Sequence, residues 1–264
     1  MKIGVCLKQV PATDTRIKMN ADGTGIALDG DVKWEVNAYD DFALEAALQM
    51  KEAGSASDVV IFSVGGADCE ARIKDGLARG ATGAVRLDDP AFAGSDALGV
   101  ARILAAAMKK AEVGLVLCGK QAIDSDSSQV PPMVAELLGW PQLTSVNALE
   151  LDGDTLTATR PAGGGNSDVV KASLPAVVST DKGLNSPRFA SLRGIMMAKR
   201  KKIDVWGAGD LGLDAGSVGA GAALVEEIST SLPPARPSGH MIDGDASAQA
   251  RELVRLLRDE AKVL

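Results

Sequence analysis

The feature that most constrains the fold is an alternation of strand-like and helix-like patterns through the first 140 residues. Short apolar runs such as IGVCL (3–7) and DVVIFSV (58–64) alternate with segments of helical spacing such as 40–54 and 95–111. Parallel strands need crossover connections of this kind, and the helices then cover the sheet. We therefore predict an α/β protein with a doubly wound, mostly parallel, Rossmann-like sheet that has helices on both faces.

Local signals fix several helix boundaries. Gly54 and Gly80 follow helical patterns and are expected to end them, and Ser95 or Asp96 is expected to cap the next helix. A further helix is predicted to open near Gln129, with prolines tolerated in its first turn.

The pattern changes after residue 140. The runs TSVNALEL, TLTATR and VVKASL are separated by turn residues, which predicts an added antiparallel hairpin, and 175–180 reads as another buried strand.

After Ile203 the chain is rich in Gly and Pro, and a last amphipathic helix is expected at about 246–262. We predict a nucleotide-binding α/β domain over 1–203 and a C-terminal arm over 204–264. The arm's helix must dock on the main domain or on another chain.

Composition excludes several classes of protein. With 46% hydrophobic residues the chain can bury a large core, and no apolar run reaches the ~18 residues that a membrane span requires. The formal net charge of -7 argues against general nucleic-acid binding. Three widely separated cysteines are read as reduced and buried, as in a cytoplasm or organelle matrix. We expect no membrane insertion and no nucleic-acid partner.

No catalytic or metal-binding residue is predicted. A phosphate-binding GxxxxGK[ST] motif and a GxGxxG motif after the first strand are both missing, and no cluster of metal ligands is visible. The single histidine, His240, lies in the Pro/Gly-rich arm and is read as a solvated surface residue.

The most informative loop is LVLCGKQAIDSDSSQVPP (115–132). Ligands of open α/β sheets bind beyond the carboxyl ends of the strands, and a helix start offers free N–H groups to a phosphate. Ser127, Ser128 and Gln129 could add hydrogen bonds. The alternative is an ordinary loop in which Asp126 or Ser127 caps the following helix.

A second informative segment is LNSPRFASLRGIMMAKRKK (184–202), where an apolar stretch meets the densest run of cations in an acidic chain. From the residues alone, a helix with Leu192, Ile195 and Met196 in the core and the cations at a solvated end is the favoured interpretation.

The chain resembles the beta subunit of electron transfer flavoprotein over nearly all of its length. The resemblance rests on KQVP (8–11), VNAYDDFALEAAL (36–48), GKQAID (119–124) and, above all, the stretch 174–203. It implies an alpha subunit as partner, a redox FAD shared with that subunit, and a buried adenine nucleotide, AMP. It also implies an electron carrier rather than a complete enzyme, located in a bacterial cytoplasm or a mitochondrial matrix.

The resemblance assigns cofactor-binding residues. Cys6 and Val64 would flank the adenine, and Tyr39 would lie beside the flavin or pack at a subunit interface. One wall would be formed by Asn37, Ala38, Tyr39 and Asp40. The base, ribose and phosphate would be cradled by Gly119, Lys120, Gln121, Ala122, Ile123, Asp124, Ser125, Asp126, Ser127, Ser128, Gln129 and Val130.

The resemblance also reverses the interpretation of residues 184–202, which become a docking segment for flavoprotein dehydrogenases. Leu192 would be an exposed anchor that enters an apolar pocket, with Ile195 beside it. Positive potential would come from Arg193, Lys199, Arg200, Lys201 and Lys202. Electrons would pass on to a quinone oxidoreductase or another acceptor.

Two alternatives remain open. A related branch of the family binds a second FAD in place of AMP and bifurcates electrons from NADH. Gln129-Val130 and FAGSD (92–96) favour that branch, whereas Ala97 counts against it, and AMP is preferred. Val130 and Pro131 also replace the common Thr and Gly, which affects the phosphate geometry. An adenine-nucleotide-dependent enzyme of the same fold is less favoured, because KQVPATDTR (8–16) lacks a Ser-rich pyrophosphate loop.

Overall fold

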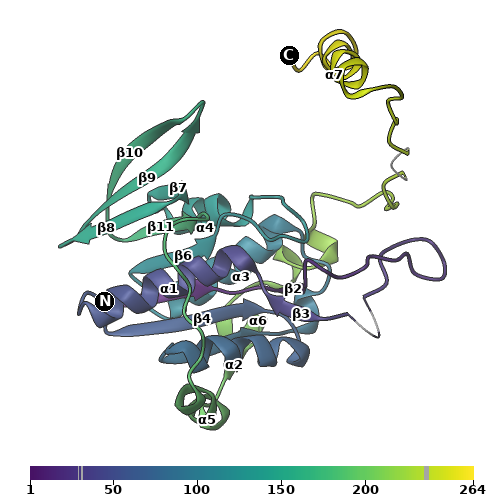
Figure 1. The fold of residues 1–264 in the computed structure, drawn as a ribbon. Helices are drawn as coiled ribbons and strands as arrows, with labels where there is room; N and C mark the ends of the chain where they lie inside the picture. Colours follow the sequence, from purple (N-terminus) through teal and green to yellow (C-terminus); the bar gives the residue numbers. More distant parts are fainter. Residues whose placement is uncertain (29, 31, 235–237) are drawn as a thin grey trace. The chain divides into compact units, whose positions relative to one another are not determined.

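A seven-stranded, entirely parallel sheet forms the centre of the protein (Figure 1). The structure is a computed structural model that describes residues 1–28, 30, 32–234 and 238–264. Its strand order is β12-β5-β4-β1-β6-β11-β7. The strands are β1 (Lys2–Cys6), β4 (Asp58–Val64), β5 (Gly83–Leu87), β6 (Leu115–Gly119), β7 (Gln142–Val146), β11 (Ala176–Thr180) and β12 (Asp204–Trp206). Every neighbouring pair runs parallel.

Helices cover both faces of this sheet. One apolar cluster joins the sheet to α1 (Ala38–Glu52), α2 (Glu70–Arg79) and α5 (Leu192–Arg200). A second cluster, on the other face, joins it to α3 (Ala97–Lys110) and α4 (Val130–Leu138). Alternate strand residues enter the two clusters, as Ile61 and Phe62 do, because successive side chains point to opposite faces. The predicted doubly wound α/β fold is confirmed.

The expected helix boundaries hold. Asp96, not Ser95, is the N-cap of α3, and its carboxylate accepts a hydrogen bond from the Gly99 N–H at 2.8 Å. Gly80 follows α2 with φ of 134°, a conformation that glycine adopts readily. α4 begins at Val130, immediately after Gln129.

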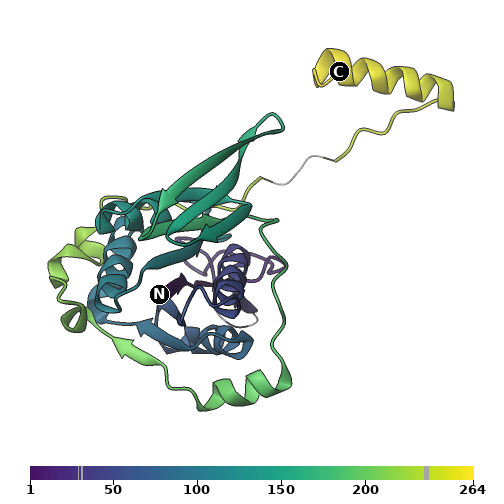
Figure 2. The same ribbon diagram turned by 90° about the vertical axis from the view of Figure 1, so that its left-hand side faces the viewer.

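The antiparallel part is a three-stranded sheet of β8 (Ala148–Asp152), β9 (Thr155–Gly163) and β10 (Asn166–Ser173). The long β9–β10 hairpin extends beyond the main sheet (Figure 2). One detail differs from expectation. The run TSVNALEL was read as one antiparallel strand, but its first part is β7, which pairs in parallel with β11. A short hairpin of β2 (Gln9–Pro11) and β3 (Trp34–Val36) was not anticipated.

The chain divides into two compact units. The first comprises 1–16 and 28–228 and contains the main sheet, the antiparallel sheet and α6 (Ala208–Leu211). Because β12 pairs with β5, residues 204–206, which the sequence assigns to the arm, belong to this unit. The second unit comprises 17–27 and 229–264 and contains α7 (Ala246–Arg255), which continues into a π-helical turn. None of the helices described is long and apolar enough to cross a membrane.

Candidate functional site

The strand order creates a switch point between β1 and β6. From β1 the chain moves outward through β4 to β5, then crosses back to place β6 on the other side of β1. Loops that leave neighbouring strands in opposite directions open a crevice at their carboxyl ends, where α/β proteins bind ligands. Three residues assigned to the adenine site end strands at this edge, namely Cys6 of β1, Val64 of β4 and Gly119 of β6.

Asn37, immediately before α1, fixes the loop that follows β6. Its side chain is 1% exposed. The amide Nδ2 donates to the Gln121 carbonyl at 2.9 Å, and Oδ1 accepts from the Ile123 N–H at 3.1 Å. With both ends of the amide engaged by backbone, Asn37 holds the shape of the loop.

Asp40 ties together the ends of the two strands at the switch point. Its buried carboxylate accepts hydrogen bonds from the Lys8 N–H at 2.8 Å, just beyond β1, and from the Gly119 N–H at 3.0 Å, at the end of β6. Burial raises the pKa of Asp40 to about 7, although these hydrogen bonds oppose the rise. Asp40 therefore ties the end of β6 to the residues that follow β1, and its assignment as a wall residue stays a prediction.

Close packing explains the glycine at position 119. A Cβ there would lie 2.4 Å from Asp40 Oδ1 and 2.6 Å from Tyr39 Cβ. Only a residue without a side chain lets the first turn of α1 approach the end of β6 this closely.

The loop after β6 is held by its own side chains. Gln121 Nε2 donates to Asp126 Oδ1 at 2.7 Å, and Ser128 Oγ donates to Gln121 Oε1 at 3.0 Å. Lys8 pairs with Asp124 at 2.7 Å. The reading of Asp126 or Ser127 as a helix cap is wrong, since the N-cap of α4 is Gln129 and makes no side-chain cap.

Backbone geometry makes the end of this loop suited to an anion. Asp126 and Ser128 have φ of 50° and 54°, and Gln129 returns to the right-handed helical region. Alternating left- and right-handed residues turn successive N–H groups toward one concavity, a recurring phosphate-binding arrangement. The prolines at 131 and 132 remove two N–H groups from the first turn of α4, so the donors must come from the loop and Val130.

Tyr39 lies at the adjoining edge, beside β6 and β11. The Lys120 ammonium lies 5.0 Å from the centre of the Tyr39 ring and pairs with Asp181 at 3.0 Å. Thr180 Oγ1 donates to the Tyr39 carbonyl at 3.0 Å. Tyr39 is half-buried, and the Lys120 ammonium makes a cation–π contact with its ring.

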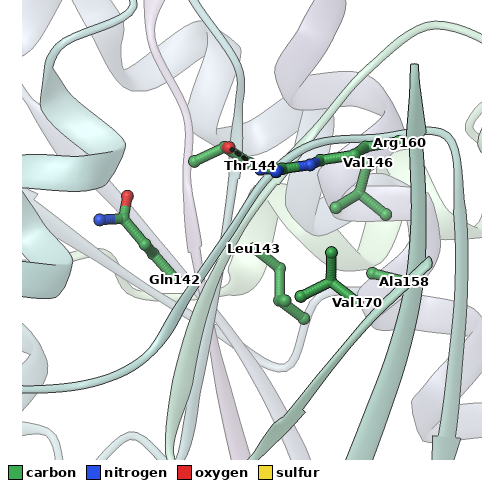
Figure 3. A pocket seen from close by; sticks show the side chains of 7 residues that line it. All are labelled: Gln142, Leu143, Thr144, Val146, Ala158, Arg160 and Val170. Atoms are coloured by element: carbon green, nitrogen blue, oxygen red, sulfur yellow. Dashed lines mark hydrogen bonds between the residues drawn. The ribbon is translucent and has the colours of Figure 1, made fainter. Parts of the chain in front are cut away.

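A small cavity of about 10 Å³ lies elsewhere, between β7 and the antiparallel sheet (Figure 3). Its walls include Leu143, Ala158 and Val170, and Arg160 donates a hydrogen bond to Thr144 beside it. It shares no residue with the predicted nucleotide site and has room for about one water molecule.

The docking segment carries several exposed apolar side chains. Leu192 is 83% exposed, Met196 65%, Ile195 41%, and Phe189 97%. The interpretation of Leu192, Ile195 and Met196 as core is therefore wrong. The residue of α5 that is buried is Ala198. Close contact with α2 requires Gly194, where a Cβ would lie 2.1 Å from the Ala78 carbonyl oxygen.

The cations of this segment are not equivalent. Lys201 Nζ donates to the Ala81 carbonyl, and burial lowers the pKa of Lys201. Lys202 pairs with Asp204 at 3.0 Å. Lys199, Arg200 and Arg193 are exposed. The expected positive cluster is thus reduced, because Lys201 anchors the helix and Lys202 has an acidic neighbour.

Sequence reasoning missed several residues that build these regions. Lys8, Thr180 and Asp181 support the loop, and Arg188 attaches the docking segment to α1. Lys8 lies within the motif KQVP and Arg188 within the stretch 174–203, but their partners are distant in sequence.

Comparisons with known proteins agree with this architecture. The sequence model of the electron transfer flavoprotein domain matches residues 24–211. The beta subunit of electron transfer flavoprotein from Bradyrhizobium diazoefficiens is 39% identical over 264 residues, 100% of both chains. The human beta subunit is 38% identical, covering 97% of this chain and 99% of its own, and that of Bacillus subtilis is 36% identical over all of both chains. The predicted resemblance is confirmed, and the chain belongs to the electron transfer flavoprotein family, as a beta subunit.

Proposed function

We propose that this protein is one half of a heterodimeric electron carrier, in which it pairs with an alpha subunit and supports a redox FAD. Family membership over the full length of related beta subunits supports the role. The half-buried Tyr39 ring, positioned by Thr180 and Lys120, offers an aromatic face for the flavin. FAD would supply the electron-carrying chemistry, and residues of this chain would shield one side of it.

The single observation that carries the nucleotide assignment is the Asn37–Asp40 framework at the switch point. Four hydrogen bonds from or to these buried side chains fix the backbone of Lys8, Gly119, Gln121 and Ile123. An adenine would lie against Cys6 and Val64 at the strand ends. The phosphate would receive N–H groups from residues 127–130, because the Asp126 N–H already donates to the Ala122 carbonyl at 2.8 Å. These donors and the strand ends would together fit an adenine nucleotide.

AMP is favoured over a second FAD. FAGSD (92–96) resembles the bifurcating branch, but its polar side chains have structural partners. Ser95 Oγ accepts from the Gly219 N–H at 2.8 Å, and Asp96 accepts from the N–H groups of Gly99 and Leu224. These contacts fasten residues 219–224 to the start of α3. The motif therefore gives no independent support for a second flavin.

The segment 184–202 would dock flavoprotein dehydrogenases, and the carrier would deliver electrons to a quinone oxidoreductase or another acceptor. An apolar row of Phe189, Leu192 and Met196 is exposed on it. Lone exposed apolar residues are common, but three on one short segment, with cations beside them, are typical of a recognition surface.

The second unit would pack against the alpha subunit. Leu253 and Val254 of α7 are 48% and 45% exposed, and no residue of that helix is buried. A chain truncated before Asp243 is expected to give less heterodimer after co-expression with the alpha subunit. Full recovery of flavin-loaded heterodimer from that truncation would contradict this role.

The defining experiment is co-expression with an alpha subunit from the same organism, followed by purification and a visible spectrum. A flavin band that is bleached by a flavoprotein dehydrogenase and its substrate is the expected result. A colourless heterodimer, or a flavin that dehydrogenases do not reduce, would overturn the carrier function.

A further inference from the structure

We propose that Arg188 is a positioning residue that clamps the docking segment to α1 and so holds its apolar row ready for a partner. The inference rests on the docking function proposed for Leu192. In the free protein the apolar row must stay exposed and ordered, although the chain on the N-terminal side of α5 forms neither helix nor strand.

The clamp is a dense set of contacts on one buried carboxylate. Arg188 donates to Glu45 from its backbone N–H at 3.2 Å, from Nε at 2.8 Å and from Nη2 at 2.9 Å. Its guanidinium also pairs with Glu52, two turns further along α1, through Nη2 at 2.9 Å and through Nη1. Gln49 Nε2 donates to Glu45 at 2.9 Å and completes the site.

Burial shows that the Arg188–Glu45 pair is structural. The Glu45 side chain is 5% exposed, whereas Arg188 is 32% exposed. Burial alone would raise the pKa of Glu45, but the hydrogen bonds from Arg188 and Gln49 hold it below its usual value. A planar guanidinium with two parallel bonds to a carboxylate fixes direction as well as distance, which an ammonium does not.

Besides the clamp, Leu184 and Ala190 pack partly buried against the core at the two ends of this stretch. Between Asp181 and Ser191 the described chain forms neither helix nor strand, and Figure 2 shows it running as an extended connection from β11 to α5. Asn185 Nδ2 donates to the Phe42 carbonyl at 2.9 Å, a second attachment to the same helix. The residue after Arg188 is the fully exposed Phe189. Without the clamp, ordering this stretch would have to occur on binding, at the expense of affinity.

The clamp also separates two roles that a cation can have in docking. Glu45 and Glu52 neutralise Arg188, so it adds little to the positive field that a partner meets. Arg193 lies five residues on, exposed, and forms no ion pair within the described parts of the chain. Loss of Arg193 should weaken electrostatic attraction alone, whereas loss of Arg188 should loosen the segment.

The test uses the flavin-loaded heterodimer with Arg188→Lys and Arg188→Met, and with Arg193→Met as the charge-matched control. In the free heterodimer, both Arg188 variants should exchange amide hydrogens across 185–192 about ten-fold faster than the parent. With a flavoprotein dehydrogenase as electron donor, the KM for the carrier should rise about five-fold or more, with kcat and the flavin spectrum unchanged and no relief from salt. Arg193→Met should show parental exchange and a KM defect that disappears with salt.

Parental exchange and parental KM in Arg188→Lys would overturn the proposal, because a lysine keeps the charge but not the fork. If the Arg188 variants do not fold, Glu52→Gln replaces them, because it leaves the buried Arg188–Glu45 pair in place. This variant should show smaller increases in amide exchange and in KM. No change in either quantity would count against the clamp. A parental KM in Leu192→Ala would refute the docking assignment, yet the exchange measurement would still decide the clamp.

Discussion

The nucleotide loop (119–130) and the docking segment (184–202) both approach α1, but they use buried polar groups in opposite ways. At the loop, the buried Asn37 and Asp40 hold backbone in place around a crevice at the sheet edge. At the docking segment, the buried Glu45 holds a surface stretch so that Phe189 and Leu192 remain exposed. One arrangement prepares an interior for a small ligand, and the other prepares an exterior for a protein.

Substitutions in the two regions should therefore have different measurable effects. Changes at the loop should cost nucleotide and stability, whereas changes at the docking segment should cost electron transfer only. Each substitution below is expected to affect one region without the other.

The largest effect is expected from Gly119→Ala. The added methyl group would overlap Asp40 and the Tyr39 backbone, so the end of β6 or the start of α1 must move. Overpacking of this severity costs about 3 kcal/mol or more. Chemical denaturation should show that loss of stability, together with loss of bound adenine nucleotide. Gly209→Ala is the control, because nothing lies within 4 Å of a Cβ at that position. Equal stability of the two variants would contradict the described packing.

Leu192→Ala is expected to have the next largest effect, and only on docking. Truncating a true anchor costs ~2 kcal/mol or more, which corresponds to roughly a 30-fold higher KM for the carrier. The flavin spectrum and nucleotide content should stay parental. Leu224→Ala is a matched control, since Leu224 is 79% exposed but lies outside the docking segment. If Leu192→Ala instead unfolds the protein, Leu192 has a packing role that its exposure does not indicate.

A pH dependence should mark the loop region. The pKa of Asp40 is about 7 in the folded protein against an ordinary value of 3.8, so the folded state binds the proton more tightly. This contribution to stability is fully present below about pH 4 and is lost as the pH rises toward 7, by up to about 1.4 kcal/mol per pH unit. Asp40→Asn cannot titrate and should lack this slope in urea denaturation series. A parental slope in Asp40→Asn would assign the titration to another group.

The smallest effect is expected from replacing Lys199 and Arg200 together by Gln. Both are exposed, and surface charges of this kind contribute less than about 1 kcal/mol. Stopped-flow reduction by a dehydrogenase should show slower association at low salt and a parental rate at high salt. Lys201→Gln should differ, because it removes the bond to the Ala81 carbonyl and loosens α5 at every salt concentration. Identical behaviour of the two variants would remove the distinction between anchoring and steering cations.

The strand and helix pattern was sufficient to predict the sheet, because buried parallel strands and amphipathic helices leave strong local signals. Asp96 as a cap and Gly80 as a helix end followed from the same local chemistry. The reading of 184–202 from residues alone failed, because an amphipathic helix looks the same whether its apolar face meets a core or a partner. The family resemblance predicted an exposed face, and the exposure of Leu192 agrees with that prediction.

The polar framework could not be predicted. Asp40 meets Gly119 across 79 residues, and Glu45 meets Arg188 across 143. Such pairs depend on which strands become neighbours, and spacing along the chain does not encode that directly. Sequence reasoning assigned the residues of the loop after β6 as ligands, and that assignment stays a prediction. The geometry adds that Asn37 and Asp40 hold this loop and the strand ends by hydrogen bonds.

We propose that the switch-point loop holds an adenine nucleotide separate from the redox flavin. The stoichiometry of the ligands released from the protein tests this proposal most directly. The purified heterodimer is denatured, and the supernatant is resolved by liquid chromatography against AMP and FAD standards. We expect one AMP and one FAD per heterodimer, with AMP lost from Gly119→Ala and retained in Leu192→Ala. Release of two FAD would place the protein in the bifurcating branch, and release of FAD with no other adenine compound would contradict the nucleotide site.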